Sequence, residues 1–415
     1  MFYKKRVIVK NNVITHIFNK YEYKILYKRI LFTLFILLIY ILGSKVAIVG
    51  DHAMRHHDSS FYKLAVSNMG GDINRLNVFS LGLGPWLTAM IIISLMSYKN
   101  MEKAMRQTRA EKHYKEKFLT LGLSVIQGYF VLNQFVKHEQ LQKSNELLLL
   151  LVLITGAMLM MWLADQNVRY GIAGPMPIVM MSVIRSMYAQ GLPTLSVGTV
   201  MLMIVIALMG MAMFTLLLIE MIEYRTHYRD ITDISRADEL TYLAWKINPG
   251  GSISIMISLS VFVLFNSAIS LIVHMATGET ADIRWVSFNH FIGITIYLFM
   301  QTILGYLLSR LIINTKQNTK DFLKSGHYFV GVKPGEETGA YLNRMARRLC
   351  WFGTLIVAVI IGVPLYSSLL VPHLSQQIYL AVQLIIMVYL AMNITETLRT
   401  YLYFDKYGQF LNKYW

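Results

Sequence analysis

The sequence predicts an all-α polytopic membrane protein with ten transmembrane helices. Three observations support this fold class. Of the 415 residues, 55% are hydrophobic and only 15% are charged, a composition typical of membrane proteins. Apolar stretches of about 20 residues, the length needed to cross roughly 30 Å of hydrocarbon, recur along the whole chain. Lysine and arginine, which give a formal net charge of +16, are concentrated between particular stretches.

The ten predicted helices follow one another along the chain, and no segment between them has the composition of a soluble domain. The first, around "ILFTLFILLIYILG", is expected to remain as an anchor because no small-residue cleavage site follows it. We expect the helices at residues 28–48, 78–97, 118–136, 146–164, 172–190, 197–221, 252–274, 286–312, 350–371 and 377–400.

The basic residues are unevenly distributed between the predicted helices. They gather in the N-terminal arm, in the loop after the second helix and in the loop after the eighth, whereas the 372–376 turn has none. With ten helices, the three basic segments fall on one side of the membrane. This positive-inside pattern predicts a multi-pass protein with both termini in the cytoplasm. The charge therefore indicates a lipid bilayer rather than nucleic acid as the partner.

Three of the predicted helices contain residues that disfavour helix near their starts. A glycine inside a helix costs about 1 kcal/mol and a proline about 3 kcal/mol. Such breaks are tolerated at membrane depth where they face protein or a cavity, although both residues are also common in membrane helices. The candidate hinge residues are Gly82, Gly84 and Pro85 in the second helix, Gly174 and Pro175 in the fifth, and Pro249 and Gly250 in the seventh.

Ten helices divide naturally into two groups of five at about residue 191. An odd number of helices per group gives the second group inverted topology, and inverted repeats place a functional site between the two halves. We therefore expect an N-terminal half, 1–191, and a C-terminal half, 192–415.

Three classes of function fit such a chain: a protein-conducting channel, a secondary transporter and a membrane-embedded enzyme. A coupled transporter usually needs ionisable groups at membrane depth. Most charged residues here lie at helix ends, with Asn393 and Glu396 in the tenth helix as polar exceptions. Neither a phosphate-binding loop nor a convincing catalytic set occurs, so no catalytic residue and no cofactor is expected. His52 and His56 are weak zinc candidates, and an exposed polar loop is the favoured interpretation.

Several segments, in order along the chain, resemble the SecY family of channel subunits of the bacterial protein translocon. They are "NVFSLGLGPWLTAMIIISLM", "MWLADQNVRYGIAGP", "LAWKINPGG" and "LKSGHYFVGVKPGEETGAYLNRMARRL". The resemblance covers nearly the whole chain. It implies the SecY/Sec61 fold, in which two inverted five-helix halves surround a central pore. It also implies that unfolded secretory polypeptides pass across the bacterial plasma membrane.

The motifs depart from the usual family pattern at several positions. Gly174-Pro175 stands where the family has Asn-Gly, Trp86 where it has Tyr, and Lys333 where it has Arg. Such drift resembles the accessory SecY paralogues of Gram-positive bacteria, which work with an accessory SecA and export serine-rich glycoproteins. A housekeeping or plastid SecY of the general secretion pathway is the alternative, and an inverted-repeat secondary transporter is the second alternative.

The resemblance also implies which residues line the channel. A plug is expected at about 58–76, with Gly70-Gly71 as its hinge. An ordinary extracellular loop is the alternative for this segment, and inter-helix packing is the alternative for the methionines named next. The expected pore ring is Leu83, Leu87, Met176, Met180, Met256 and Ala391, and the expected lateral gate carries Gln127, Ser252 and Ser254. Simple inter-helix hydrogen bonding remains open for the three gate residues.

The expected partners follow from the same resemblance. A SecA-type motor ATPase would dock on the loops at about 224–248 and 314–348, and a positive-inside role is the alternative for the arginines there. The candidate motor-binding residues are Lys333, Arg344, Arg347 and Arg348. A signal peptide, a preprotein and small SecE- or SecG-like membrane subunits complete the set of expected partners.

Overall fold

A computed structural model describes residues 24–48, 65–71, 76–99, 106–138, 146–190, 199–231, 241–277, 290–370 and 375–412. Helices dominate these ranges. The first group is α2 (Lys24–Lys45), α4 (Gly84–Lys99), α6 (Arg109–His138), α7 (Glu146–Tyr170) and α8 (Met176–Gln190). The second group is α9 (Thr199–Met221), α10 (Gly251–Thr277), α11 (Phe291–Ile313), α13 (Glu336–Leu370) and α14 (Ser375–Asn412).

Within the described ranges, these ten helices correspond one to one with the predicted spans, so the predicted fold class is confirmed. Six helical stretches, containing α2, α7, α10, α11, α13 and α14, are long and apolar enough to cross a membrane. Helices α4 and α8 and the second half of α9 are shorter apolar helices.

The largest differences from the predicted boundaries are extensions of α13, α14 and α6, and the smaller differences at α4 and α8 have a local cause. Helices α4 and α8 begin later than predicted because the residues before them form turns, with Gly82 at φ +57° and Gly174 at φ +56°. Helix α13 begins at Glu336, well before the predicted start at 350. Its extra turns bury Leu342 and Ala346, and a spacing of four residues places these two on one helix face with the buried Cys350.

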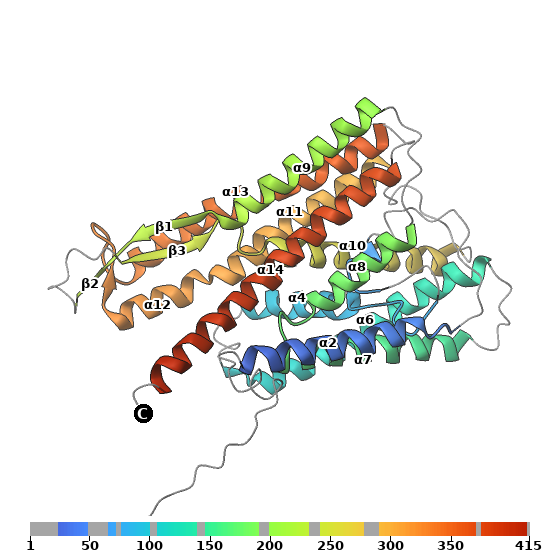
Figure 1. The fold of residues 1–415 in the computed structure, drawn as a ribbon, viewed down its shortest axis with the longest axis horizontal. Helices are drawn as coiled ribbons and strands as arrows, with labels where there is room; N and C mark the ends of the chain where they lie inside the picture. Colours follow the sequence, from blue (N-terminus) through green and yellow to red (C-terminus); the bar gives the residue numbers. More distant parts are fainter. Residues whose placement is uncertain are drawn as a thin grey trace, which may run out of the picture.

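The helices form two groups that meet along two seams (Figure 1). Helix α10 packs against α4 and α6 of the first group as well as against α11 of its own group. Helix α14 packs against α8 and α2 on one side and against α9 and α13 on the other. The two groups come from the two predicted halves of the chain. The inverted relation of those halves remains a prediction.

The two loops predicted to bind a motor fold together into one unit, here named the loop platform. Strands β1 (Glu223–His227) and β3 (Tyr242–Lys246) form an antiparallel hairpin. Strand β2 (Arg229–Asp230) pairs with β4 (His327–Tyr328), which follows helix α12 (Thr315–Ser325). A small apolar core joins these elements to the ends of α11 and α13: Trp245, Ile313, Phe322, Phe329, Leu342, Ala346 and Cys350.

Candidate functional site

A short stretch of the predicted plug lies at the centre of the helix bundle. We name residues 65–71, "AVSNMGG", the central segment. All seven of its residues are buried, and Asn68 is 0% exposed. The flanking parts of the predicted plug, 58–64 and 72–75, lie outside the described residues. Burial of a polar, glycine-containing connection inside a helix bundle requires partners for its backbone groups.

Three elements of the first group supply those partners. The backbone N–H of Leu83 donates to the carbonyl oxygen of Met69 at 2.7 Å. The Tyr40 hydroxyl on α2 donates to the Gly70 carbonyl oxygen at 3.1 Å. The Ser182 hydroxyl on α8 donates to the Gly71 carbonyl oxygen at 2.8 Å. The central segment is therefore fixed to the first group mainly through its own carbonyl groups.

The second group reaches the central segment through α14. Gln383, which is buried on α14, places its amide nitrogen 3.5 Å from the Ser67 hydroxyl and 3.3 Å from the Ser186 hydroxyl on α8. These long contacts are weaker than the backbone hydrogen bonds on the other side. They link α14, the central segment and α8 across one of the seams.

The "LGLGPW" stretch before α4 forms the seat of the central segment. Gly82 has the left-handed φ that glycine tolerates. A Cβ atom added at Gly82 would lie 2.6 Å from the Met69 carbonyl oxygen and closer still to the backbone nitrogen of Gly71. Both contacts are to backbone, which cannot swing away as a side chain can. Glycine at 82 therefore allows the two chain segments to lie against each other.

Gly84 lies where the central segment meets the other seam. A Cβ atom added there would be 2.9 Å from the Met69 sulfur, 3.3 Å from the Gln127 side-chain oxygen on α6 and 3.6 Å from the Ser260 hydroxyl on α10. The Ser260 hydroxyl also donates to the Gly84 carbonyl oxygen at 2.6 Å. One glycine thus contacts the central segment, the first group and the second group.

The predicted gate residues fall in different places. Gln127 is buried beside Gly84, at the seam between α4, α6 and α10. The Ser254 hydroxyl accepts a hydrogen bond from Gln301 on α11 at 3.3 Å, which joins two helices of the second group. The side chain of Ser252 lies outside the described part of the structure. The seam residue that the sequence did not reveal is Ser260, because "SISIMISLSV" offers several serines and spacing alone does not choose among them.

The predicted ring residues are also divided. Leu83, Leu87 and Met256 are buried members of one apolar cluster that spans both groups, and Met176 packs half-buried against it. Met180 and Ala391 are half-buried and do not belong to this cluster, as far as the described residues define it. Ile178 belongs to the cluster, and its side chain lies 3.6 Å from the Cβ position of Gly70. Ring membership of the six residues remains a prediction.

The break before α8 is stabilised by the side chain of Asn167. At Gly174-Pro175, the buried Asn167 amide of α7 donates to the carbonyl oxygens of Ile172, at 3.0 Å, and Gly174. Asn167 also accepts a hydrogen bond from Thr33 on α2 at 3.0 Å.

Pro249 and Gly250 form a turn just before α10. A Cβ atom added at Gly250 would lie 2.9 Å from the Ser309 hydroxyl on α11. The absence of a side chain at Gly250 therefore lets the turn approach α11 closely.

The candidate motor-binding residues lie on the surface of the loop platform. Lys333 has 85% of its side chain exposed. Its backbone N–H donates to a Glu337 carboxylate oxygen at 3.2 Å, in the first turn of α13. Arg344, Arg347 and Arg348 are exposed on the same helix. The described residues contain no group of three His, Cys, Asp or Glu side chains placed to hold a metal ion, and His52 and His56 lie outside them.

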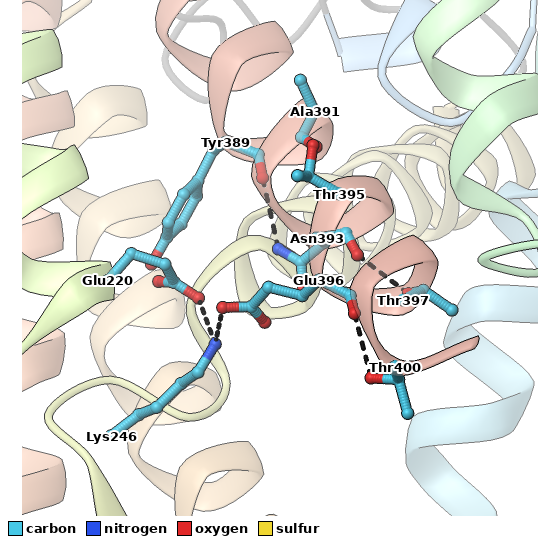
Figure 2. A network of polar contacts seen from close by, with 9 residues as sticks. All are labelled: Glu220, Lys246, Tyr389, Ala391, Asn393, Thr395, Glu396, Thr397 and Thr400. Carbon is cyan, nitrogen blue, oxygen red and sulfur yellow. Dashed lines mark hydrogen bonds and ion pairs between the residues drawn. The ribbon is translucent and has the colours of Figure 1, made fainter. Parts of the chain in front are cut away.

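A polar cluster on α14 involves one of the two exceptions found in the sequence. Glu396 forms an ion pair with Lys246 at the end of β3, and Lys246 also pairs with Glu220 at the end of α9 (Figure 2). The Asn393 amide donates to the backbone of its own helix, at the Tyr389 carbonyl oxygen, 3.2 Å away. The sequence indicated Glu396 as a charged exception within the tenth helix and Glu220 as a charged group at a helix end, but it did not indicate Lys246 as their partner.

The family model named SecY matches residues 77–395 of this chain. The chain belongs to the SecY family. The match covers the stretch from the turn before α4 to within α14, so it includes the seam of α10 with α4 and α6, the contact of α14 with α8 and the loop platform, whereas α2 and the central segment precede it. Membership of this family also removes the reason to consider an inverted-repeat secondary transporter.

Named SecY relatives come from staphylococci. The chain is 72% identical over 407 residues to the accessory Sec system protein translocase subunit SecY2 of Staphylococcus pseudintermedius, which covers 98% of this chain and 100% of the relative. It is 51% identical to the subunit of the same name from Staphylococcus epidermidis, with 96% and 100% coverage. These similarities confirm the accessory type predicted from the motif departures. The chain is a translocation-channel subunit of the accessory Sec type.

Solved structures show the same SecY/Sec61 fold at low sequence identity. A protein-conducting channel superimposes with a TM-score of 0.66 at 12% identity, covering 95% of this chain and 98% of that chain. Sec61 in the canine ribosome–channel complex from the endoplasmic reticulum gives a TM-score of 0.62, also at 12% identity, with 95% and 98% coverage. The chain is therefore a multi-pass membrane protein with the fold of these channels.

Proposed function

We propose that this structure is the closed state of the channel and that the central segment is its plug. The position of this segment carries the proposal, because it is buried at the centre of the bundle and held by helices of both groups. A SecY structure with a TM-score of 0.63 and 12% identity is described as having a plug domain that stabilises the closed state and maintains a membrane seal. The same role suits residues 65–71.

The apolar cluster beside the central segment is the proposed constriction. Leu83, Leu87 and Met256 line it, with Met176, Met180 and Ala391 as the further proposed members. An apolar constriction resists wetting and so blocks ions. Methionine side chains are flexible, which would allow the constriction to close around an unfolded polypeptide of any sequence.

Opening would separate α10 from α4 and α6. That movement breaks the hydrogen bond from Ser260 to the Gly84 carbonyl and removes Ser260 from the space around Gly84, while Gln127 on α6 stays beside α4. Because Met69 of the central segment contacts Gly84, the same movement loosens the plug. A signal peptide or a motor opens the channel if it binds the separated state more tightly than the closed state.

The loop platform is the proposed docking surface for an accessory SecA-type motor. Its exposed cations Lys333, Arg344, Arg347 and Arg348 support this role. We place the chain in the bacterial plasma membrane with both termini cytoplasmic, on the positive-inside distribution. Serine-rich glycoproteins are the proposed substrates, and SecE- or SecG-like small subunits are further candidate partners.

A crosslink between the plug and α14 tests the proposal. Ser67→Cys and Gln383→Cys are introduced with Cys350→Ala, and the channel is reconstituted in liposomes with the accessory SecA-type motor of a staphylococcal relative. A reducible bifunctional thiol reagent is expected to abolish ATP-dependent transport of a preprotein, and a reductant is expected to restore it. The physical reason is that the crosslink holds the plug to α14 in the closed arrangement.

A second crosslink serves as the matched control. Ser254→Cys and Gln301→Cys join α10 to α11 within the second group, so this crosslink should leave transport intact. Continued transport through the channel crosslinked at 67 and 383 would contradict the plug assignment. Absence of motor-dependent transport before any crosslinking would contradict the proposed partner.

A further inference from the structure

One partly buried ion cluster has no part in the proposed plug, ring or gate. Lys246, the last residue of β3, places its ammonium 3.2 Å from the Glu220 carboxylate on α9 and also pairs with the Glu396 carboxylate on α14. Figure 2 shows the three side chains pointing toward one another from three different elements. The cluster therefore joins the hairpin of the loop platform to two helices of the second group.

The cluster is not an ordinary surface ion pair. Only 6% of the Glu220 side chain and 30% of the Lys246 side chain are exposed, whereas Glu396 at the edge of the cluster is 41% exposed. Burial lowers the pKa of Lys246, but its hydrogen bond to Glu396 and the charges of Glu220 and Glu396 together raise that pKa above its ordinary value. Lys246 is thus a charged ammonium between two carboxylates. Truncation of one partner in such a cluster leaves an uncompensated buried charge.

Lys246 has an alternative partner in its own hairpin that it does not use. The residue opposite Lys246 in the β1–β3 pairing is Glu223. The Glu223 carboxylate instead pairs with the exposed Arg225 at 3.3 Å. Lys246 is directed away from the hairpin surface and toward α9 and α14, which indicates that its contacts serve the junction with the helices.

Two further contacts hold the chain just after Lys246 against α14. The Asn248 amide donates to the Tyr389 hydroxyl at 3.1 Å. A Cβ atom added at Gly251, the first residue of α10, would overlap that same hydroxyl. Tyr389 and Glu396 are seven residues apart and therefore lie on one face of α14. This face contacts the chain from the end of the hairpin to the start of α10.

The connected elements are those that must move during opening. The hairpin belongs to the loop platform, α10 forms the seam with α4 and α6, and α14 forms the seam with α8 and α2. A displacement of the hairpin would therefore reach both seams through residues 246–251. We infer that Lys246 is a positioning residue that couples the loop platform to α14 and α10, an inference that rests on the proposed motor-driven function.

Titration of the motor against reconstituted channel variants tests this coupling. Lys246→Met keeps the length of the side chain and removes its charge. The maximal rate of motor-dependent transport is expected to fall at least fivefold, while the motor concentration giving half-maximal rate changes less than twofold. Lys246→Arg is expected to retain at least half of the rate. Lys115→Met, which removes an exposed cation paired with Glu111 on α6, is the matched control and should resemble wild type.

Two double variants separate coupling from simple charge compensation. Lys246→Glu with Glu396→Lys keeps one ammonium and two carboxylates, so it is expected to regain much of the rate. Lys246→Met with Glu220→Gln removes the link and also the buried carboxylate, so no buried charge is left unpaired and its rate should remain low. A full return of transport in this neutral pair would overturn the inference, and so would a loss of motor affinity with an unchanged maximal rate.

A spin-label measurement tests the same coupling without a motor. Labels at the exposed positions Tyr242 on β3 and Thr400 on α14 report the distance between hairpin and helix. Lys246→Met is expected to broaden that distance distribution, whereas Lys115→Met should leave it unchanged. Equal distributions in the two variants would overturn the inference. If wild-type channel and motor show no transport, the proposed function fails, and this measurement still decides the structural link.

Discussion

The starts of α4 and α8 have similar sequences, but their helix-breaking residues have different structural roles. "LGLGPW" precedes and enters α4, and "GIAGPM" does so for α8. At α4, Gly82 and Gly84 leave room for the central segment, which packs against them in the folded chain. At α8, the turn is closed by Asn167 of the neighbouring α7, which donates to its carbonyl groups.

The difference shows that glycine can be required at a helix start for two reasons: close packing of a neighbouring segment, or the local path of the backbone. A glycine with left-handed φ and backbone within contact distance of its Cβ position is required by a neighbouring segment. A glycine in a turn that is capped by a buried amide is required by the local path of the chain. We therefore expect changes at α4 to affect sealing and changes at α8 to affect folding.

The largest effect is expected from Gly82→Ala. An L-residue in the left-handed region costs roughly 1–2 kcal/mol, and the new Cβ would also press on the backbone of the central segment. We expect ion leak through reconstituted channels to rise at least about tenfold, the factor equivalent to about 1.4 kcal/mol. Gly122→Ala on α6, where a Cβ meets nothing within 4 Å, is the control. Equal leak in the two variants would show that Gly82 does not seat the plug.

Asn167→Leu is expected to act on stability instead. It leaves the carbonyl groups of Ile172 and Gly174 without their buried donor, and an unsatisfied buried polar group costs about 1–3 kcal/mol. Thermal unfolding in detergent should shift to lower temperature, while folded channels in liposomes should remain sealed. Thr155→Val, on an exposed position of α7, is the comparison. If Asn167→Leu made the channel leaky and left its unfolding temperature unchanged, the α8 start would contribute to sealing and not to stability, contrary to this expectation.

A smaller effect is expected from Gln383→Leu on α14. Its contacts to Ser67 and Ser186 are long, and a hydrogen bond of this kind contributes about 0.5–1.5 kcal/mol. We expect leak to increase about threefold, a factor that corresponds to somewhat less than 1 kcal/mol. Thr395→Val, which removes a bond within the exposed side of α14, should leave conductance unchanged. A sealed Gln383→Leu channel would mean that the plug is held from the first group alone.

The smallest effect is expected from glycine at Met176 and Met180. Both side chains are half-buried near the start of α8, and glycine there would widen the proposed constriction without moving the plug. A modest rise in leak, measured in the same bilayers, would place them in the ring. Met211→Gly on the exposed side of α9 controls for the glycine itself. A leak no greater than that of this control would remove both methionines from the ring and favour Ile178.

The sequence by itself determined the ten membrane helices, their order and the family. The length of an apolar stretch and the positions of basic residues are local properties, so they can be recognised without knowledge of the fold. The same holds for the presence of breaks at Gly82, Gly174 and Pro249, because glycine and proline act on their own backbone. Helix boundaries moved where those breaks formed turns or where an amphipathic extension, as in α13, continued beyond the apolar run.

Only the tertiary structure decided what each break contacts and which polar groups meet. Ser260 rather than Ser254 reaches Gly84, and Lys246 rather than Arg225 reaches Glu396. The two loops joined into one platform through β2–β4 pairing and a shared apolar core. These are contacts between residues far apart in the chain, and they depend on helix rotation and on distances that residue spacing does not encode. The "LGLGPW" stretch is a helix break in the sequence and a seat for the central segment only in the folded chain.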